Sequence, residues 1–231
     1  MHTVGIDVGS TNVKAALVGD AGEGLAAVSR PLHTLRQDRR AELDAGVLWD
    51  TVVGALVDLS RASTEAGLGG LGEVGAVRGC GRYSSTCAGL DPRGTARCRD
   101  VRAREPDALA TGTERHPTPP VGGGLSLGHL LALEHDEPEV HRRTHAYLEP
   151  VDYVTARLTG VVSATQASMF AAQLVDNRQL GQTRYDADLV RLAGVDPTRL
   201  PPLVAPGSPV GAVRADVAAA TGLPPDAVVV A

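Results

Sequence analysis

The chain contains few aromatic residues and no large excess of charge of either sign. Aromatic side chains make up 3% of its 231 residues, and the formal net charge is −5. Surfaces that bind nucleic acid usually carry a basic excess, often with aromatic side chains between the basic ones. We therefore expect no nucleic-acid partner.

Long apolar runs are missing as well. One of the longest, Ala227 to Ala231, falls far short of the roughly 20 residues that cross a bilayer as a helix. The N-terminus has no charged segment followed by an apolar stretch, which is the pattern of a signal peptide. We expect a cytoplasmic protein that makes no contact with a membrane.

Cysteine is scarce. Cys80, Cys87 and Cys98 lie within one short stretch, at spacings that match neither a disulfide framework nor a zinc site. We expect all of them to be reduced thiols, as is usual in the cytoplasm.

The first third of the chain predicts strands followed by one long helix. Apolar, β-rich runs cover Thr3 to Val8, Asn12 to Val18 and Leu25 to Leu32, and short turns join them into an antiparallel meander. Apolar residues at helical spacing then predict a helix from Asp44 to Ala66, and Val74 to Gly79 predicts a buried strand. This order favours an α/β fold of the ribonuclease-H or actin type, with a mixed sheet that opens in a three-stranded antiparallel meander.

The rest of the chain predicts shorter elements. Proline, glycine and threonine crowd together from Pro106 to Gly124, which indicates a loop. Apolar residues make up 43% of the sequence, enough for one substantial core or, less simply, two small ones. We therefore treat residues 1–231 as one domain. Short helices are predicted at Ser126 to His135, Pro138 to Thr144, Pro150 to Leu158 and Ala187 to Leu192.

The turn after the first strand has the composition of a phosphate site. Gly9 lets the backbone approach phosphate oxygens, and Ser10 and Thr11 add hydroxyl and N–H donors. Asp7 can hold Mg²⁺ directly or through water, and Lys14, the only lysine in the chain, can place a positive charge opposite the phosphates. The alternative is an ordinary hairpin turn with an incidental aspartate.

This turn resembles the first phosphate motif of the actin-like sugar kinases, Asp-x-Gly-Ser/Thr-Ser/Thr-x-x-Lys. Further motifs follow in the same order as in the FGGY family of carbohydrate kinases, and the resemblance is greatest to its xylulokinase-like members. The collinear order carries the resemblance, because most of the motifs are weak individually. They are Glu42 with Asp44 and Trp49, Gly79 to Asp91 with Gly94, Asp100 to Arg102, Tyr153 with Arg157 to Gly160, Ala167 with Ser168, Asp176 to Arg178, Leu200 to Val204, and Gly222 to Pro224.

The resemblance implies transfer of phosphate from ATP, with Mg²⁺, to a hydroxyl of a small sugar or polyol. Asp7 would then serve the metal, and Gly9, Ser10, Thr11 and Lys14 the nucleotide. The residues that would contact the substrate are Arg82, Tyr83, Ser84, Ser85, Asp100 and Arg102.

Departures from the family pattern leave the substrate open. Ser84 and Ser85 stand where xylulokinases have a Met-His pair and glycerol kinases an Arg-Glu pair, and Cys98 replaces an expected tryptophan. We expect these changes to remove bulk or charge from the sugar pocket, so that neither xylulose nor glycerol is assigned.

The resemblance covers only the N-terminal, sugar-binding domain of such a kinase. It implies that the second actin-like domain is absent, that the catalytic base lies beyond Ala231, and that the chain alone is inactive. Two other classes stay open: a noncatalytic sugar-sensing or interaction domain, and an unrelated actin-fold ATPase. The sequence does not set the oligomeric state, and a homodimer is one option.

Overall fold

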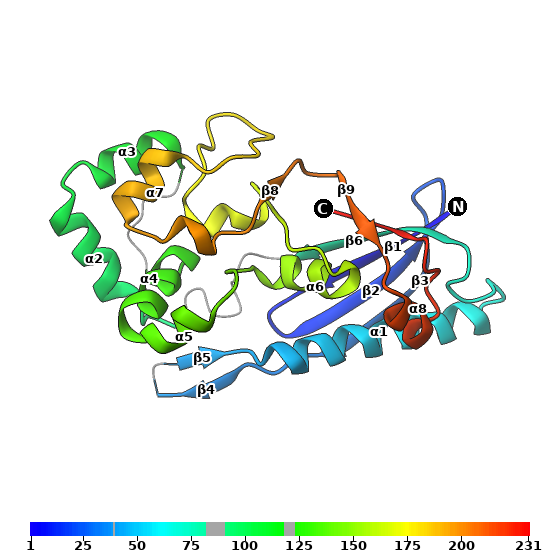
Figure 1. The fold of residues 1–231 in the computed structure, drawn as a ribbon. Coiled ribbons are helices and arrows are strands. Elements are labelled where there is room, and N and C mark those ends of the chain that lie inside the picture. Colours follow the sequence, from blue (N-terminus) through cyan, green and yellow to red (C-terminus); the bar gives the residue numbers. More distant parts are fainter. Residues whose placement is uncertain (39, 82–90, 118–122) are drawn as a thin grey trace.

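A computed structural model describes residues 1–38, 40–81, 91–117 and 123–231. Its centre is a six-stranded mixed sheet with the strand order β3-β2-β1-β6-β10-β9 (Figure 1). The strands are β1 (His2–Val8), β2 (Asn12–Val18), β3 (Gly24–Pro31), β6 (Val74–Gly81), β9 (Pro209–Ala212) and β10 (Val228–Val230).

The first three strands form the expected antiparallel meander. β1 pairs with β2, and β2 pairs with β3, both in antiparallel register. Along β1, Val4, Ile6 and Val8 are buried, whereas the residues between them are only half-buried. This alternation with a period of two places one side of the strand in the core. The prediction of an α/β fold with a mixed sheet is confirmed.

β6 and β10 run parallel to β1, and β9 closes the sheet in antiparallel orientation. The carboxyl ends of β1, β6 and β10 therefore meet at one edge of the sheet. In α/β sheets this is the edge at which ligands usually bind.

One face of the sheet is covered by α1 (Ala45–Glu65), α6 (Pro150–Thr159) and α8 (Ala215–Thr221), as Figure 1 shows. The Asp44 side chain begins α1 by accepting a hydrogen bond from the Val47 N–H at 2.9 Å. The same face of α1 that the sequence predicted, including Leu48, Val52 and Leu59, packs in the first hydrophobic cluster.

A second hydrophobic cluster lies away from the sheet, which corresponds to the less simple of the two arrangements that the composition allowed. Its members include Cys98, Leu131, Met169 and Leu192. Two separate cores arise because these helices pack mainly against one another and not against the sheet. The helices of this part are α2 (Thr95–Arg104), α3 (Ala108–Arg115), α4 (Ser126–Asp136), α5 (Pro138–Arg143) and α7 (Ala187–Ala193).

Helix α3 corrects the prediction of a loop from Pro106 to Gly124. Proline stands before the helix, where its missing N–H costs nothing, and Ala108 and Gly112 turn inward at a spacing of one helical turn. The Arg115 guanidinium then bonds to Asp186, the N-cap of α7, at 2.6 Å. Tertiary packing against α7 therefore stabilises a segment whose composition is typical of a loop.

Short elements connect the two clusters. β4 (Leu35–Gln37) and β5 (Arg40–Glu42) form a hairpin, β7 (Ala164–Thr165) pairs with β8 (Leu203–Val204), and the segments Ser168–Ala172 and Pro197–Arg199 are 3₁₀ turns. Figure 1 shows the β4–β5 hairpin extending from the start of α1 toward α5.

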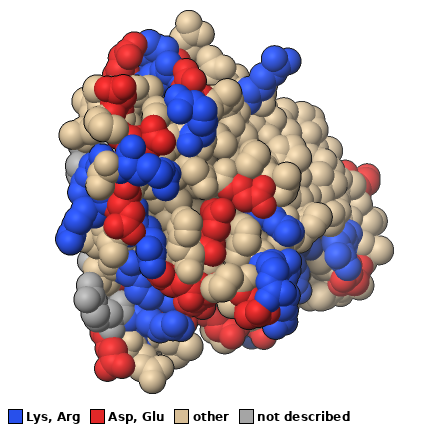
Figure 2. All heavy atoms as spheres, turned by 60° about the vertical axis from the view of Figure 1, so that its left-hand side comes forward, with Lys and Arg blue, Asp and Glu red and all other residues tan. Residues whose placement is uncertain are grey.

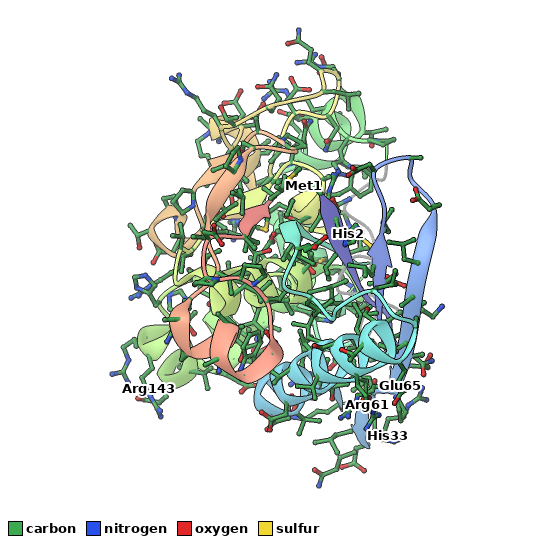
Figure 3. The ribbon with its side chains drawn as sticks, turned by 90° about the vertical axis from the view of Figure 1, so that its right-hand side faces the viewer. Met1, His2, His33, Arg61, Glu65 and Arg143 are labelled. Atoms are coloured by element: carbon green, nitrogen blue, oxygen red, sulfur yellow. The ribbon has the colours of Figure 1, made fainter. Side chains whose placement is uncertain are left out.

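The surface carries both signs of charge. Figure 2 shows acidic and basic side chains mixed over the face that carries the second cluster. Arg97 illustrates this mixing, because it pairs with both Asp100 and Asp136. In the described ranges, no helix is long and apolar enough to cross a bilayer. Figure 3 shows Met1 and His2 at the start of β1, and Arg143 of α5 directed away from the body of the protein.

Candidate functional site

The turn between β1 and β2 brings the backbone close to itself. The Gly9 N–H donates to the Asn12 carbonyl oxygen at 2.9 Å, and a Cβ atom added to Gly9 would lie 2.9 Å from that oxygen. A side chain at this position would therefore force the turn to open. Ser10 and Thr11 lie on the exposed tip of the turn, where their hydroxyls and N–H groups are accessible. The local geometry suits a site that wraps a phosphate with backbone donors.

Asp7 and Lys14 are direct partners across the β1–β2 pair. Because Val8 and Val13 face the first cluster, Asp7 and Lys14 point to the opposite face of the sheet. Asp7 is half-buried and Lys14 is exposed. Among the described residues, neither side chain makes an ion pair within 4.0 Å.

The Asp7 carboxylate contacts a thiol. The Cys80 Sγ atom, at the end of β6, lies 3.9 Å from Asp7 Oδ1 and can donate a weak hydrogen bond to it. Burial raises the pKa of the Cys80 thiol, and the negative charge of Asp7 raises it further. Asp7 thus keeps a carboxylate that no protein cation neutralises within the described residues, beside a turn in which Gly9 has no side chain. These residues fit a magnesium ion with its phosphates.

The expected substrate residues are not assembled around Asp7 in the described chain. Arg82, Tyr83, Ser84 and Ser85 lie outside the described residues. Asp100 and Arg102 are on α2, where Asp100 is exposed and its carboxylate pairs with Arg97 at 3.0 Å. Arg102 is half-buried on the same helix. Their assignment to the sugar remains a prediction.

Cys98 lies inside the protein. Its side chain is buried in the second cluster, together with Val101 on the next turn of α2. Burial also raises the pKa of this thiol. The helical period turns this position inward, into the second cluster, and its place in a sugar pocket remains a prediction. Cys80 and Cys98 are both free cysteines, as expected, whereas Cys87 lies outside the described residues.

A cavity of about 460 Å³ opens at the carboxyl ends of β6 and β10. One wall is formed by β6, through Gly79 and Cys80, and another by α6, through Asp152 and Thr155. Ser163, just after α6, contributes a further hydroxyl. Since Cys80 also contacts Asp7, the cavity adjoins the candidate metal and phosphate turn.

Asp152 is a site residue that the sequence analysis missed. It is 6% exposed, and burial raises the pKa of its carboxyl to about 7, an effect that the charge of Glu149 increases and a hydrogen bond with Ser168 opposes. Among the described residues, its Oδ2 atom is buried without a hydrogen-bond partner. The available signal was an acidic residue between Val151 and Val154 in an apolar helix, where a charge is costly to bury.

A second cavity, of about 550 Å³, lies between the start of α1 and α4 with α6. Its walls are mainly apolar, with Leu48, Leu130 and Tyr153 among them. Glu149 also reaches it, and its carboxylate accepts a hydrogen bond from the Ser126 hydroxyl.

An ion-pair network fixes the segment that leads into α2. Asp91 is fully buried and pairs with Arg93 at 2.6 Å, and it also accepts from the Ala41 N–H of β5 at 3.1 Å. Burial alone raises the pKa of Asp91, but the hydrogen bonds from Arg93 and Ala41 outweigh it and lower the pKa to about 2. Arg93 continues to Glu42 at 2.8 Å and to Glu137 at 3.3 Å. The network thus joins β5, the start of α2 and the end of α4.

The sheet order and the turn after β1 are those of an α/β domain with an actin-like fold. A solved structure with the same arrangement is the xylulose kinase from Rhodospirillum rubrum, which matches with a TM-score of 0.82 at 24% identity and covers 100% of this chain and 48% of that one.

Sequence comparisons lead to the same group of proteins. The family model described as "FGGY family of carbohydrate kinases, N-terminal domain" matches residues 118–231. The xylulose kinase of Streptomyces rubiginosus is 28% identical over 221 residues, which cover 91% of this chain and 44% of that protein. The xylulose kinase of Bacillus subtilis (strain 168) is 25% identical over 232 residues, which cover 96% of this chain and 45% of that protein.

Residues 118–231 thus match the N-terminal domain of the FGGY family of carbohydrate kinases, and nearly the whole chain is similar in sequence to xylulose kinases. It spans about half the length of the curated relatives it matches.

Proposed function

We propose that this chain is the sugar-binding half of a carbohydrate kinase that transfers phosphate from ATP to a hydroxyl of a small sugar or polyol. The activity belongs to a protein that contains this chain together with the second half that its relatives have. The observation that carries the proposal is the turn after β1, where Asp7 has no cationic partner in the described chain and Gly9 leaves room only for backbone. A cytoplasmic location, where ATP is available, is part of the proposal.

Each residue of the turn has a role that follows from its position. The N–H groups and hydroxyls of Ser10 and Thr11 bind phosphate oxygens, and Gly9 keeps the backbone close enough for them to do so. Lys14, across the strand pair from Asp7, places its ammonium near the same phosphates. Asp7 would hold Mg²⁺, directly or through water. When bound, Mg²⁺ neutralises charge on the phosphates that are transferred.

In phosphoryl transfer the protein mainly positions the reacting groups and neutralises the charge of the phosphates. The fold supplies positioning, because the turn is anchored on both sides by paired strands of the central sheet. The relatives' names favour a ketopentose such as xylulose, but Ser84 and Ser85 replace the residues that those enzymes use, so we propose only the class of sugar or polyol.

The experiment is an exchange of Asp7→Asn, with Asp50→Asn as the matched control. Asp50 is an exposed acid on the outer side of α1. We expect Asp7→Asn to abolish binding of MgATP by the chain, measured by calorimetry, and to abolish sugar-dependent ADP release in a protein that includes the second half. Circular dichroism checks that both variants keep the fold.

The control should behave like the unaltered chain in every assay. Near-normal turnover by Asp7→Asn would refute the role of this turn. Sugar binding without any ADP release in the longer protein would favour a noncatalytic sugar-sensing domain instead.

A further inference from the structure

The cavity at the carboxyl ends of β6 and β10 has walls with polar groups that the protein itself does not use. Its volume of about 460 Å³ lies within the range of about 300–1,000 Å³ that is usual for small-molecule pockets. Three lining residues, Asp152, Thr155 and Ser163, are only 6%, 6% and 4% exposed. Side chains buried to this degree are normally hydrogen-bonded.

These three side chains keep unused hydrogen-bonding capacity. Within the part of the chain that the structure describes, the hydroxyls of Thr155 and Ser163 have no hydrogen-bond partner, and the Oδ2 atom of Asp152 is buried without one. Thr221, which is just as deeply buried in α8, donates to the Val217 carbonyl oxygen at 2.8 Å. That bond to the preceding turn is the usual arrangement for a helical threonine, and Thr155 departs from it.

The position of Thr155 explains where its hydroxyl points. A Cβ atom added to Gly79 of β6 would lie 3.9 Å from Thr155 Oγ1 and 2.9 Å from a methyl group of Val151. The hydroxyl therefore faces the end of β6 across the gap that glycine leaves open. Ser163 reaches the same cavity from the segment that follows α6.

The chemistry of the walls limits the class of ligand. An apolar molecule would leave the two hydroxyls unpaired, which costs free energy. A phosphate or carboxylate would meet the acid of Asp152, and the nearest cationic lining residue, Arg78, is exposed and not buried with it. A molecule with several hydroxyls can both donate to and accept from Thr155 and Ser163, and can bond to Asp152.

We propose that this cavity binds the sugar or polyol, with Thr155 and Ser163 as specificity-determining contacts. The ligand class rests on the proposed function, whereas the place does not, since among the described residues neither Asp100 nor Arg102 lines the cavity. Cys80 connects the two sites, because it lines the cavity and its sulfur lies 3.9 Å from Asp7 Oδ1.

The test measures binding of xylulose, xylitol and glycerol to the full chain by ligand-observed NMR and calorimetry. Thr155→Val and Ser163→Ala remove one hydroxyl each with little change in shape. Thr113→Val on α3 is the matched control, since its hydroxyl bonds to the Leu109 carbonyl oxygen at 2.7 Å on an exposed helix. Thermal unfolding followed by circular dichroism checks that all variants fold.

We expect at least one of the three probes to bind the unaltered chain and Thr113→Val with equal affinity. Loss of one hydrogen bond should weaken that binding roughly tenfold in Thr155→Val and in Ser163→Ala. Equal affinity in all four proteins, or no binding of any probe to the unaltered chain, would overturn the inference.

The two proposals fail in distinguishable ways. If the cavity variants lose polyol binding while Asp7→Asn still binds MgATP normally, the proposed kinase function fails and the cavity assignment stands. If Asp7→Asn loses MgATP while the cavity variants bind polyols as well as the unaltered chain does, the reverse holds.

Discussion

Replacing Asp152 by asparagine should make the protein more stable at alkaline pH. The carboxyl is buried in α6, and its pKa is raised from 3.8 to about 7, chiefly by burial. Above pH 7 the folded protein must hold a buried carboxylate, one oxygen of which has no hydrogen-bond partner in the described part of the chain. Asparagine has nearly the same shape and carries no charge, so it removes that cost.

The sign and size of the effect follow from proton linkage. The unfolded chain releases the Asp152 proton near pH 3.8 and the folded chain near pH 7, so the contribution of this carboxyl to stability is most favourable below pH 4 and declines as the pH rises from 4 to 7. A shift of about 3 pKa units corresponds to about 4 kcal/mol. This is an upper limit, because relaxation around a buried charge and entry of water reduce the cost.

The assay is unfolding by urea at pH 5 and pH 8.5, followed by circular dichroism. We expect the midpoint of Asp152→Asn to exceed that of the unaltered chain at pH 8.5, and by a smaller margin at pH 5, where the unfolded chain has released the proton but the folded chain has not. Asp50→Asn, an exposed acid on α1, serves as the control and should change neither value. If Asp152→Asn is no more stable than the unaltered chain at pH 8.5, the carboxyl does not carry the buried charge that we derive.

Two further outcomes follow from the same structure. Asp91 has a pKa of about 2 in place of 3.8, so its ionised form contributes about 2 kcal/mol above pH 4, and this contribution should be lost as the pH falls toward 2. In urea unfolding, Asp91→Asn should remove this acid-dependent loss and lower the stability at pH 7. An unchanged acid profile would contradict the role of the pair with Arg93. Gly9→Ala should abolish MgATP binding in calorimetry, because the new Cβ atom would lie 2.9 Å from the Asn12 carbonyl oxygen. The control Gly24→Ala should bind MgATP as before, because its new Cβ atom would have no atom within 4 Å. Equal binding by both variants would show that the turn does not need the close approach.

The sequence alone was sufficient for the elements that local signals define. The meander of β1, β2 and β3 and the long helix α1 appear where the apolar spacing and the turns predicted them. The candidate phosphate turn from Asp7 to Lys14 could also be recognised in the sequence, because all of its candidate residues lie within one short segment. Strand and helix periods act over a few residues, so they can be recognised without a three-dimensional model.

Other features depended on contacts between distant segments. Helix α2 is rich in arginine and α3 lies in a stretch rich in proline and glycine, so neither has a clear apolar pattern. α3 forms against α7, where Arg115 pairs with Asp186 across 71 positions of the chain. Local propensity is a weak prior that such packing overrides.

The sequence by itself indicated the fold class, the family resemblance and the candidate phosphate turn. Only the tertiary structure decided that Cys98 is buried, that Asp91 anchors β5 to the start of α2, and that Thr155 and Ser163 share a cavity with Asp152. The physical reason is that hydrogen-bond satisfaction and burial are properties of the assembled chain. A hydroxyl or a carboxyl is unpaired only relative to the distant segments that pack around it.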